Sequence, residues 1–224
     1  VTAGKFGPSV DPQLTQSTRE SQRVLLNALV NYGFKLEEKH NINVLAGVEK
    51  IVGNSMNFSA FRRGFVSTVI DQLFAGSEQQ RNNNGSASHS ASLNYFGRFN
   101  YDFSQKYLLE FVWRYDGSYI FPEKGRFGFF PGISAGWKIS DEDFWKSGLS
   151  FIGYFKIRGS WGKTGNDRIA PYQYLSSYGF SPTPYVLDED IEVKALRELR
   201  IANPNITWEV AQQSNIGIDG RVLN

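Results

Sequence analysis

Few residues of this chain have the types and spacing that catalysis or metal binding needs. The two histidines, His40 and His89, lie near a turn and in a Ser/Asn-rich segment, and each is expected to be an ordinary exposed side chain. Cysteine is absent, which excludes thiolate catalysis, disulfides and thiolate metal sites. We find no nucleophile elbow, phosphate-binding glycine loop or zinc-protease motif. The sequence therefore predicts a protein that is not an enzyme and that has no cofactor.

Two acidic triplets also contain side chains that could bind a metal ion. Asp141, Glu142 and Asp143 form one, and residues 188–190 form the other. Ca²⁺ takes several oxygen ligands, so each triplet has suitable atoms. Both triplets also fit a solvated loop, which is the favoured interpretation, and we expect no bound metal.

The remaining candidates are polar and charged side chains that recur at every second position in several segments. They have two interpretations: they contact a substrate or another part of the protein, or their cations pair with Asp102, Glu110 or Asp116 in a cross-strand charge ladder. The ladder is favoured, because a large polar surface must provide partners for its charges. The candidate residues are Asn94, Arg98, Asn100, Glu110, Arg114, Lys138 and Arg158.

The elements that position these residues are long alternating segments, of which residues 93–103 are the clearest. The odd-numbered positions from Leu93 to Phe103 are apolar apart from a glycine, and most of the even-numbered positions are polar. Successive side chains of a strand point to opposite faces, so this segment predicts a strand with one apolar and one polar face. Its length fits the roughly 9–11 residues of a membrane-crossing strand better than the 5–6 of an ordinary one.

The same alternation recurs along the chain and predicts an all-β fold, namely an antiparallel transmembrane β-barrel segment. Residues 1–18 are expected to be loop. Pro131 lies inside one predicted strand and cannot donate a ladder hydrogen bond, so we expect a β-bulge there. A helical turn capped by Ser140 or Asp141 is expected after that strand. The predicted strands are residues 21–35, 40–52, 93–103, 106–118, 127–140, 154–163 and 210–223.

The connections between these strands differ in length according to the side on which they lie. Membrane barrels have short periplasmic turns and longer extracellular loops, so the longer set is expected to be extracellular. Within it, residues 76–92 are rich in Asn and Ser and are expected to form a mobile, exposed loop. The shorter set includes 37–39, 104–106 and 141–153, and the longer set includes 53–91 and 164–209.

Composition agrees with this interpretation and excludes other classes. The formal net charge of +2 gives no reason to expect nucleic acid as a partner. No apolar run reaches about 18 residues, so no membrane helix is predicted. Aromatic residues make up 15% of the chain and gather near both ends of the predicted strands, as the two interface girdles of a membrane barrel would. The outer group is Trp113, Tyr115, Phe127, Phe129 and Trp161, and the inner group is Tyr101, Phe103, Tyr107, Trp137, Phe144 and Trp145.

Besides these patterns, the sequence contains several short motifs whose order resembles that of a known protein family. The motifs are Tyr95–Tyr101, Lys106–Leu109, Arg114–Ser118, Gly128–Pro131, Ser134–Ser140, Lys156–Asn166, Asn203–Glu209 and Asn215–Asp219. Together they resemble the barrel of SusC/RagA-family TonB-dependent outer-membrane transporters of Bacteroidetes. The ordered match covers about 92–223, and a looser match covers 20–76.

That resemblance implies a nutrient importer in the Gram-negative outer membrane. It implies a 22-stranded barrel, an N-terminal plug, a SusD-like surface lipoprotein as lid, TonB acting through the plug, and oligosaccharide or peptide substrates. The candidate polar residues would then line the lumen, and the long connections would contact substrate or lid. We expect residues 1–224 to be part of a single barrel domain, without the plug, and an internal section of a longer transporter, because seven strands leave open edges that lipid does not tolerate.

Two alternatives remain open from the sequence. One is an outer-membrane barrel that acts as an adhesin or structural protein without transport, which the absence of a plug from the complete gene would favour. The other is a soluble β-rich carbohydrate-binding module. That module would pack the face containing Leu93, Tyr95 and Phe99 into a core.

Overall fold

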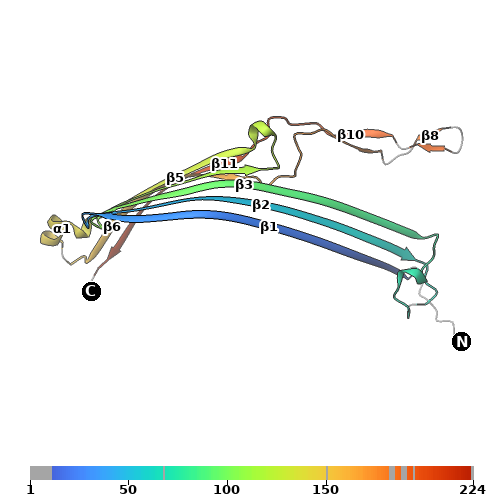
Figure 1. Ribbon diagram of the computed structural model, residues 1–224, viewed down its shortest axis with the longest axis horizontal. Coiled ribbons are helices and arrows are strands. Elements are labelled where there is room, and N and C mark those ends of the chain that lie inside the picture. The colour runs from blue at the N-terminus through green and yellow to red at the C-terminus, as the bar shows by residue number, and fades with distance from the viewer. Residues whose placement is uncertain are drawn as a thin grey trace. The chain divides into compact units, whose positions relative to one another are not determined.

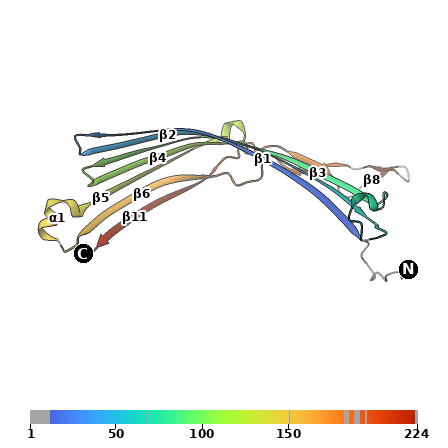
Figure 2. The ribbon, with the colours of Figure 1, turned by 60° about the horizontal axis from the view of Figure 1, so that its bottom comes forward.

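Seven strands form one sheet in a computed structural model that describes residues 12–67, 69–149, 151–181, 185–187, 191–193 and 195–222 (Figures 1 and 2). The strands lie in the order β1-β2-β3-β4-β5-β6-β11, and the registers of β3 through β6 and of β11 are antiparallel. The prediction of an all-β fold with seven long strands is therefore confirmed. The bounds are β1 Gln13–Leu36, β2 His40–Arg63, β3 Arg81–Phe103, β4 Tyr107–Ser118, β5 Phe127–Lys138, β6 Tyr154–Asn166 and β11 Glu209–Arg221.

Tight turns join β1 to β2 and β3 to β4, as predicted. Glu37 and Glu38 have φ values of 50° and 55°, and Ser104 and Gln105 have 50° and 58°. Positive φ at both central residues is the mark of a type I′ turn, whose twist matches that of the two strands it joins. Asp102 supports the second turn, because its Oδ1 accepts a hydrogen bond of 2.6 Å from the backbone N of Gln105.

The first three strands are about twice as long as the other four. β1 and β2 have 24 residues each and β3 has 23, whereas β4 and β5 have 12 each and β6 and β11 have 13 each. The chain divides into two compact units, Val1–Val24 with Val52–Ser90, and Leu25–Ile51 with Ala91–Asn224. The first unit contains the 3₁₀ turn η1, Leu73–Ala75, and the buried ring of Phe65.

The prediction of a long loop over residues 53–91 is wrong for most of that range. β2 continues to Arg63 and β3 begins at Arg81, so the connection is residues 64–80, and the Asn/Ser-rich segment is strand from Arg81 onward. Its side chains are exposed on both faces from Arg81 to Ala91. A strand with water on both sides needs no apolar face, so alternation could not reveal it, and backbone pairing with its neighbours holds it. β1 likewise begins at Gln13, inside the predicted loop 1–18; residues 1–11 lie outside the described residues.

The region around β5 differs from its prediction in two details. The register of β4 and β5 runs without a shift through the pair Trp113–Pro131, so the expected bulge is absent. Pairing of β5 with β6 ends at Gly132–Gly162, which places the missing N–H of Pro131 beyond the last paired residue on that side. The predicted helical turn is present as η3 (Ile139–Asp141) and α1 (Asp143–Gly148), but the N-cap of α1 is Glu142, without a side-chain cap hydrogen bond.

The second long connection, between β6 and β11, contains short strands that the sequence did not predict. β7 (Ser177–Phe180) pairs with β10 (Leu196–Arg200), and β8 (Tyr185–Leu187) pairs with β9 (Ile191–Val193). The acidic triplet at 188–190 lies outside the described residues. A further 3₁₀ turn, η2 (Glu123–Gly125), lies between β4 and β5.

Candidate functional site

The strand registers place all seven candidate polar residues on one face of the sheet. Directly opposed residues of an antiparallel pair share a face, and so do residues two apart on one strand. The opposed pairs that establish this are Asn94–Asp116, Phe96–Arg114, Arg98–Val112, Asn100–Glu110, Glu110–Ser134, Gly136–Arg158 and Lys138–Lys156. We call this the polar face; its role as a lumen lining stays a prediction.

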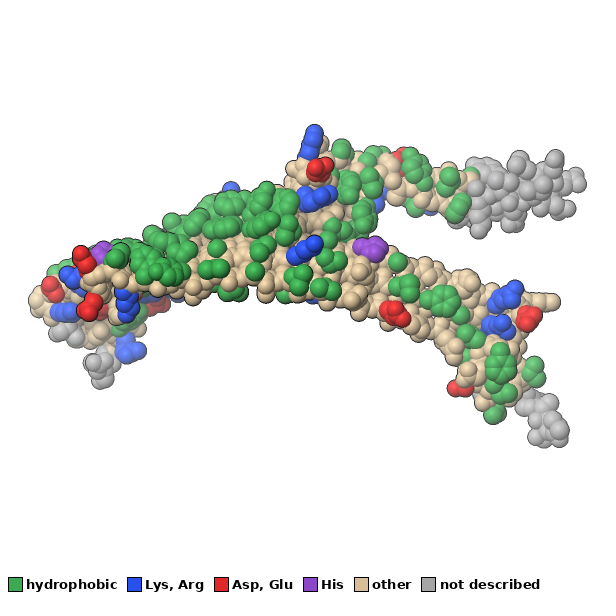
Figure 3. Space-filling model, viewed as in Figure 1, with side chains coloured by type: hydrophobic (Ala, Val, Ile, Leu, Met, Phe, Trp, Pro, Cys, Tyr) green, Lys and Arg blue, Asp and Glu red, His purple; other side chains and the backbone are tan. Residues whose placement is uncertain are grey.

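The opposite face, which we call the apolar face, carries aromatic and aliphatic side chains in the same registers. Figure 3 shows hydrophobic side chains gathered over the sheet. Near the tight turns the rings of Tyr107 and Trp137 stack, with centroids 6.1 Å apart, and Tyr115 stacks on Phe127 at 4.9 Å near the other end of β4. Opposed pairs on this face include Tyr95–Tyr115, Phe99–Phe111, Phe111–Ile133, Ile133–Trp161 and Ile157–Ile218.

Three of the candidate residues have polar partners. Asn94 is 8% exposed, and its Nδ2 donates to Oε1 of Glu49 at 3.1 Å. Arg114 donates two hydrogen bonds of 2.9 Å to the carboxylate of Asp116 on its own strand. Arg158 reaches across to Asp219 on β11, with Nε donating to Oδ2 at 3.1 Å.

The other four candidates, Arg98, Asn100, Glu110 and Lys138, make no side-chain hydrogen bond or ion pair with any described residue. The predicted charge ladder is therefore present only in part. Of its predicted pairs, only Arg114 with Asp116 forms, and it forms along one strand instead of across two. A cation and a carboxylate on adjacent strands, Arg98 and Glu110, remain available to another molecule or another part of the protein.

Two hollows lie along the polar face. The first has a volume of about 810 Å³, and the second of about 720 Å³. Glu110 lines both, so the hollows adjoin across β4. The first is lined by Asn41, Asn100, Lys156, Arg158 and Asn215, among others, and the second by Phe96, Arg98, Arg114, Thr164 and Gln213.

A cluster of side chains lies where β5 and β6 stop pairing, at the end of the sheet far from the tight turns. Trp208 packs against Phe130 and Phe121, with ring centroids 5.2 and 5.3 Å away. Its Nε1 donates to the carbonyl oxygen of Arg126 at 3.1 Å, and the hydroxyl of Thr207 donates to that of Gly125 at 2.9 Å. The second long connection is thereby fixed to the loop between β4 and β5.

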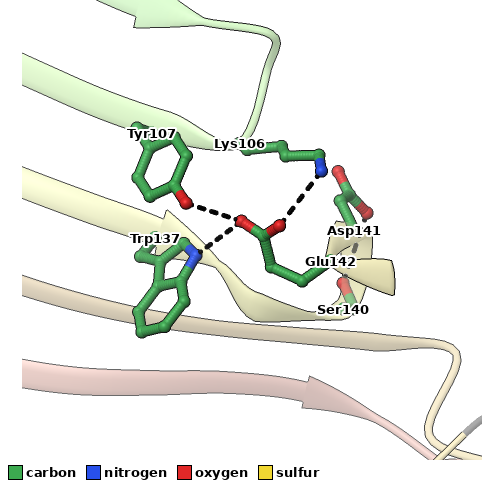
Figure 4. A network of polar contacts seen from close by, with 6 residues as sticks. All are labelled: Lys106, Tyr107, Trp137, Ser140, Asp141 and Glu142. Atoms are coloured by element: carbon green, nitrogen blue, oxygen red, sulfur yellow. Dashed lines mark hydrogen bonds and ion pairs between the residues drawn. The ribbon is translucent and has the colours of Figure 1, made fainter. Parts of the chain in front are cut away.

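A second cluster, centred on Glu142, lies at the end with the tight turns (Figure 4). Oε1 of Glu142 accepts hydrogen bonds from the hydroxyl of Tyr107 at 2.8 Å and from Nε1 of Trp137 at 3.1 Å. Its Oε2 accepts from Nζ of Lys106 at 3.1 Å. The donors of Tyr107, Trp137 and Lys106 lower the pKa of Glu142, and the hydrogen bond to Glu142 raises the pKa of Lys106.

Sequence reasoning missed both clusters as structural centres. The sequence favoured a solvated loop for Glu142, with metal binding as the alternative, yet its two oxygens accept hydrogen bonds from three donors. No group of three or more metal-ligating side chains occurs among the described residues. Both histidines also have hydrogen-bond partners. Nδ1 of His40 lies 2.8 Å from the hydroxyl oxygen of Tyr101, and Nδ1 of His89 lies 2.6 Å from Oδ1 of Asn54. Trp208 belongs to a motif that carried the resemblance, but nothing in the sequence indicated its contacts.

Within the part of the chain that is described, no helix has the length and apolar character needed to cross a membrane.

The chain is similar to known proteins both in sequence and in structure. No family model matches the chain. It is 33% identical over 200 residues to TonB-dependent receptor P26 of Formosa agariphila, covering 87% of this chain and 20% of that protein. It is 32% identical over 148 residues to TonB-dependent receptor SusC of Bacteroides thetaiotaomicron, covering 62% of this chain and 14% of that protein. The chain thus spans about a fifth or less of the length of these two relatives.

The structure resembles a solved structure of the RagAB peptide transporter, with a TM-score of 0.81 and 23% identity over 94% of this chain and 23% of that one. This likeness shows that the folds agree. The relatives are receptors and not enzymes, which confirms the prediction that the chain is not an enzyme. On these sequence relationships, the chain belongs to the TonB-dependent receptors, of which SusC is one.

Proposed function

We propose that this chain is part of the barrel wall of a TonB-linked nutrient importer in the outer membrane, with residues 1–224 in a single barrel domain. The observation that carries the proposal is the register of five consecutive strands, β3 to β6 and β11, which keeps one face apolar and the other polar. A wall between lipid and an aqueous lumen requires this alternation.

The apolar face supports lipid as its environment because it is left uncovered. Tyr95 is 40% exposed, Tyr115 is 42% exposed and Phe129 is 54% exposed. A soluble module would bury this face, yet the buried hydrophobic residues among those described are only Phe65, Phe121, Phe130 and Ile139. A continuous exposed aromatic surface of this kind marks contact with a membrane or a partner.

The spacing of the aromatic groups on this face agrees with a membrane. Phe127 and Trp137 are ten residues apart on β5 and share the apolar face. At about 3.4 Å per residue and a tilt of about 40°, they are separated by roughly 26 Å along the membrane normal. Barrels of this class have an apolar band about 25 Å tall between their aromatic girdles.

The polar face and the long connections would then handle the transported molecule. In this proposal the two hollows line the lumen, and connections 64–80 and 167–208 lie outside the cell. A SusD-like surface lipoprotein would cover that side, and TonB would act through a plug carried by another part of the receptor. The substrate would be an oligosaccharide or a peptide; RagAB, whose fold the chain shares, is a peptide transporter.

The test compares two neighbouring positions of β4 in the complete receptor, reconstituted in lipid. Phe111→Cys and Glu110→Cys are each labelled with bimane, whose fluorescence brominated acyl chains quench on contact. We expect strong quenching at 111 and little at 110, because the two side chains point to opposite faces. Equal quenching, or stronger quenching at 110, would contradict a wall with lipid on the apolar face.

Transport is tested separately with a shortened outer connection. Because residues 81–90 are strand, the deletion belongs in 69–79, before β3 begins. Cells that carry this deletion should retain the barrel in the outer membrane and lose uptake or lid association. Unchanged uptake and unchanged lid association would remove this connection from the proposed substrate path.

A further inference from the structure

We propose that the connector between β5 and β6 is a membrane-interface anchor, with α1 on the lipid side of the wall and Phe144 and Phe151 inserted into the interfacial region of the periplasmic leaflet. This inference rests on the proposed function, since it requires the apolar face to contact lipid. It assigns the connector a partner, the lipid surface, and a side of the wall on which to lie.

The side of the wall follows from one ring contact. Trp145 of α1 stacks on Phe155, with ring centroids 4.8 Å apart and planes at 10°. Phe155 lies two residues before Ile157, and Ile157 is directly opposite Trp137. Phe155 therefore belongs to the apolar face, and the connector folds onto that face and not onto the polar one.

The Glu142 cluster places the start of the connector on the same side. Tyr107 and Trp137 are opposed residues of the apolar face, and both donate hydrogen bonds to Glu142. Girdle tyrosines and tryptophans normally direct these polar groups to lipid headgroups. Here a carboxylate of the connector takes that position, so the connector occupies headgroup depth beside the girdle.

The residues that follow carry apolar side chains that are at least partly exposed. Phe144 and Phe151 are each 61% exposed, and Leu149 is 38% exposed. Phe144 directly precedes Trp145, which stacks on Phe155 of the apolar face, and Lys146 lies on the same short helix as a basic residue. Exposed phenylalanines beside a basic side chain are typical of segments that lie in the interface.

The test measures depth with a nitroxide in the reconstituted complete receptor. Phe144→Cys, Phe151→Cys and Lys146→Cys are labelled, and collision with oxygen, which partitions into lipid, is compared with collision with a water-soluble nickel chelate. Lys146 lies roughly 200° around the helix from Phe144, so it serves as the matched control. We expect the oxygen-to-nickel ratio at 144 and 151 to exceed that at 146 by about threefold or more, as for side chains inserted at the acyl boundary.

Two results would overturn the anchor. One is a ratio at 144 and 151 equal to that at 146, which places the connector in water. The other is low collision with both reagents, which means that protein covers the two rings. A nitroxide at Leu109→Cys, on the apolar face two residues after Tyr107, separates this failure from that of the proposed function. High oxygen access at 109 with either result refutes the anchor alone, whereas water access at 109 refutes the lipid-facing wall itself.

Discussion

The ring of Phe130 occupies the space that a side chain at Gly165 would need, because an added Cβ there would overlap the tip of the ring. The same ring excludes a side chain at Gly128. Trp208 packs against it with centroids 5.2 Å apart. Phe130 therefore lies in a slot formed by two glycines and an indole, at the place where backbone pairing between β5 and β6 has ended.

Replacing Gly165 by alanine should destabilise the receptor. The new methyl group would collide with a ring that Trp208 and Gly128 hold in place, and overpacking of this kind costs about 1–3 kcal/mol. Urea unfolding in detergent, followed by tryptophan fluorescence, measures the loss. Gly148→Ala is the matched control, because a Cβ there would meet nothing within 4 Å. Equal midpoints for the two variants would show that the slot can relax.

The ring contacts of Trp208 should contribute more to the free energy of unfolding than its hydrogen bond does. Trp208→Phe loses the bond to the carbonyl of Arg126, worth roughly 0.5–1.5 kcal/mol, and Trp208→Ala also loses the ring contacts, for a total of about 3 kcal/mol, the low end for tryptophan because the indole is only partly buried. Hydrogen exchange of residues 118–126 should accelerate strongly in the alanine variant and weakly in the phenylalanine variant. Unchanged exchange in both would show that this loop does not depend on Trp208.

The Glu142 cluster should weaken in acid. Because its donors lower the pKa of Glu142, the folded state binds this proton less readily than the unfolded state. The stabilisation is present above the ordinary glutamate pKa of about 4.3 and is lost as pH falls through the lower folded value. Lys106 has the opposite sign: its raised pKa makes its contribution complete below about 10.4 and lost at more alkaline pH.

Glu142→Gln isolates this effect. The wild-type receptor should melt at a higher temperature than the variant at pH 7, and the difference should shrink as the pH falls below the ordinary glutamate pKa and the carboxyl group becomes protonated, first in the unfolded state and then in the folded one. Thermal melting in detergent at several pH values measures the difference. A gap between wild type and variant that does not depend on pH would assign the loss to shape instead of charge.

The two polar contacts of Asn94 and Asp219 should differ in strength. The ion pair of Arg158 with Asp219 has side chains 58% and 40% exposed, so Asp219→Asn should change stability by at most about 0.5 kcal/mol. Asn94 is buried, and Asn94→Ala leaves a carboxylate oxygen of Glu49 without its donor, a loss of about 1–3 kcal/mol. Unfolding of both variants under the same conditions ranks them, and the reverse order would contradict this argument.

Alternation predicted the strands best where one face must be apolar. β4 and β5 were placed within one or two residues of their bounds, because apolar residues, many of them aromatic, occupy every second position from 107 to 115 and from 127 to 137. The first half of β3 was missed because polar residues on both faces carry no such mark. Its strand conformation depends on neighbouring backbones, which no local pattern records.

The candidate site shows the same limit. The common face of Arg98, Arg114 and Arg158 could be predicted, because a period of two fixes the face once the strand is known. The residues with which these arginines pair could not be predicted from the sequence. Asp219 meets Arg158 through the register of β11, a strand 61 residues away in sequence, and Arg114 turns to its own strand through a rotamer choice.

The place where β5 and β6 part also bears on how the wall assembles. Trp208 immediately precedes β11, whose first pair with β6 is Glu209–Asn166. A slip of β11 by one residue would shift the indole by about 3.3 Å and turn the following side chains to the wrong face, so Trp208 could no longer reach Phe130. Strands can pair backbone to backbone in several registers, but this cluster forms in only one of them. The packing of Trp208 therefore favours the native register of β11, a strand that begins more than forty residues after the end of β6.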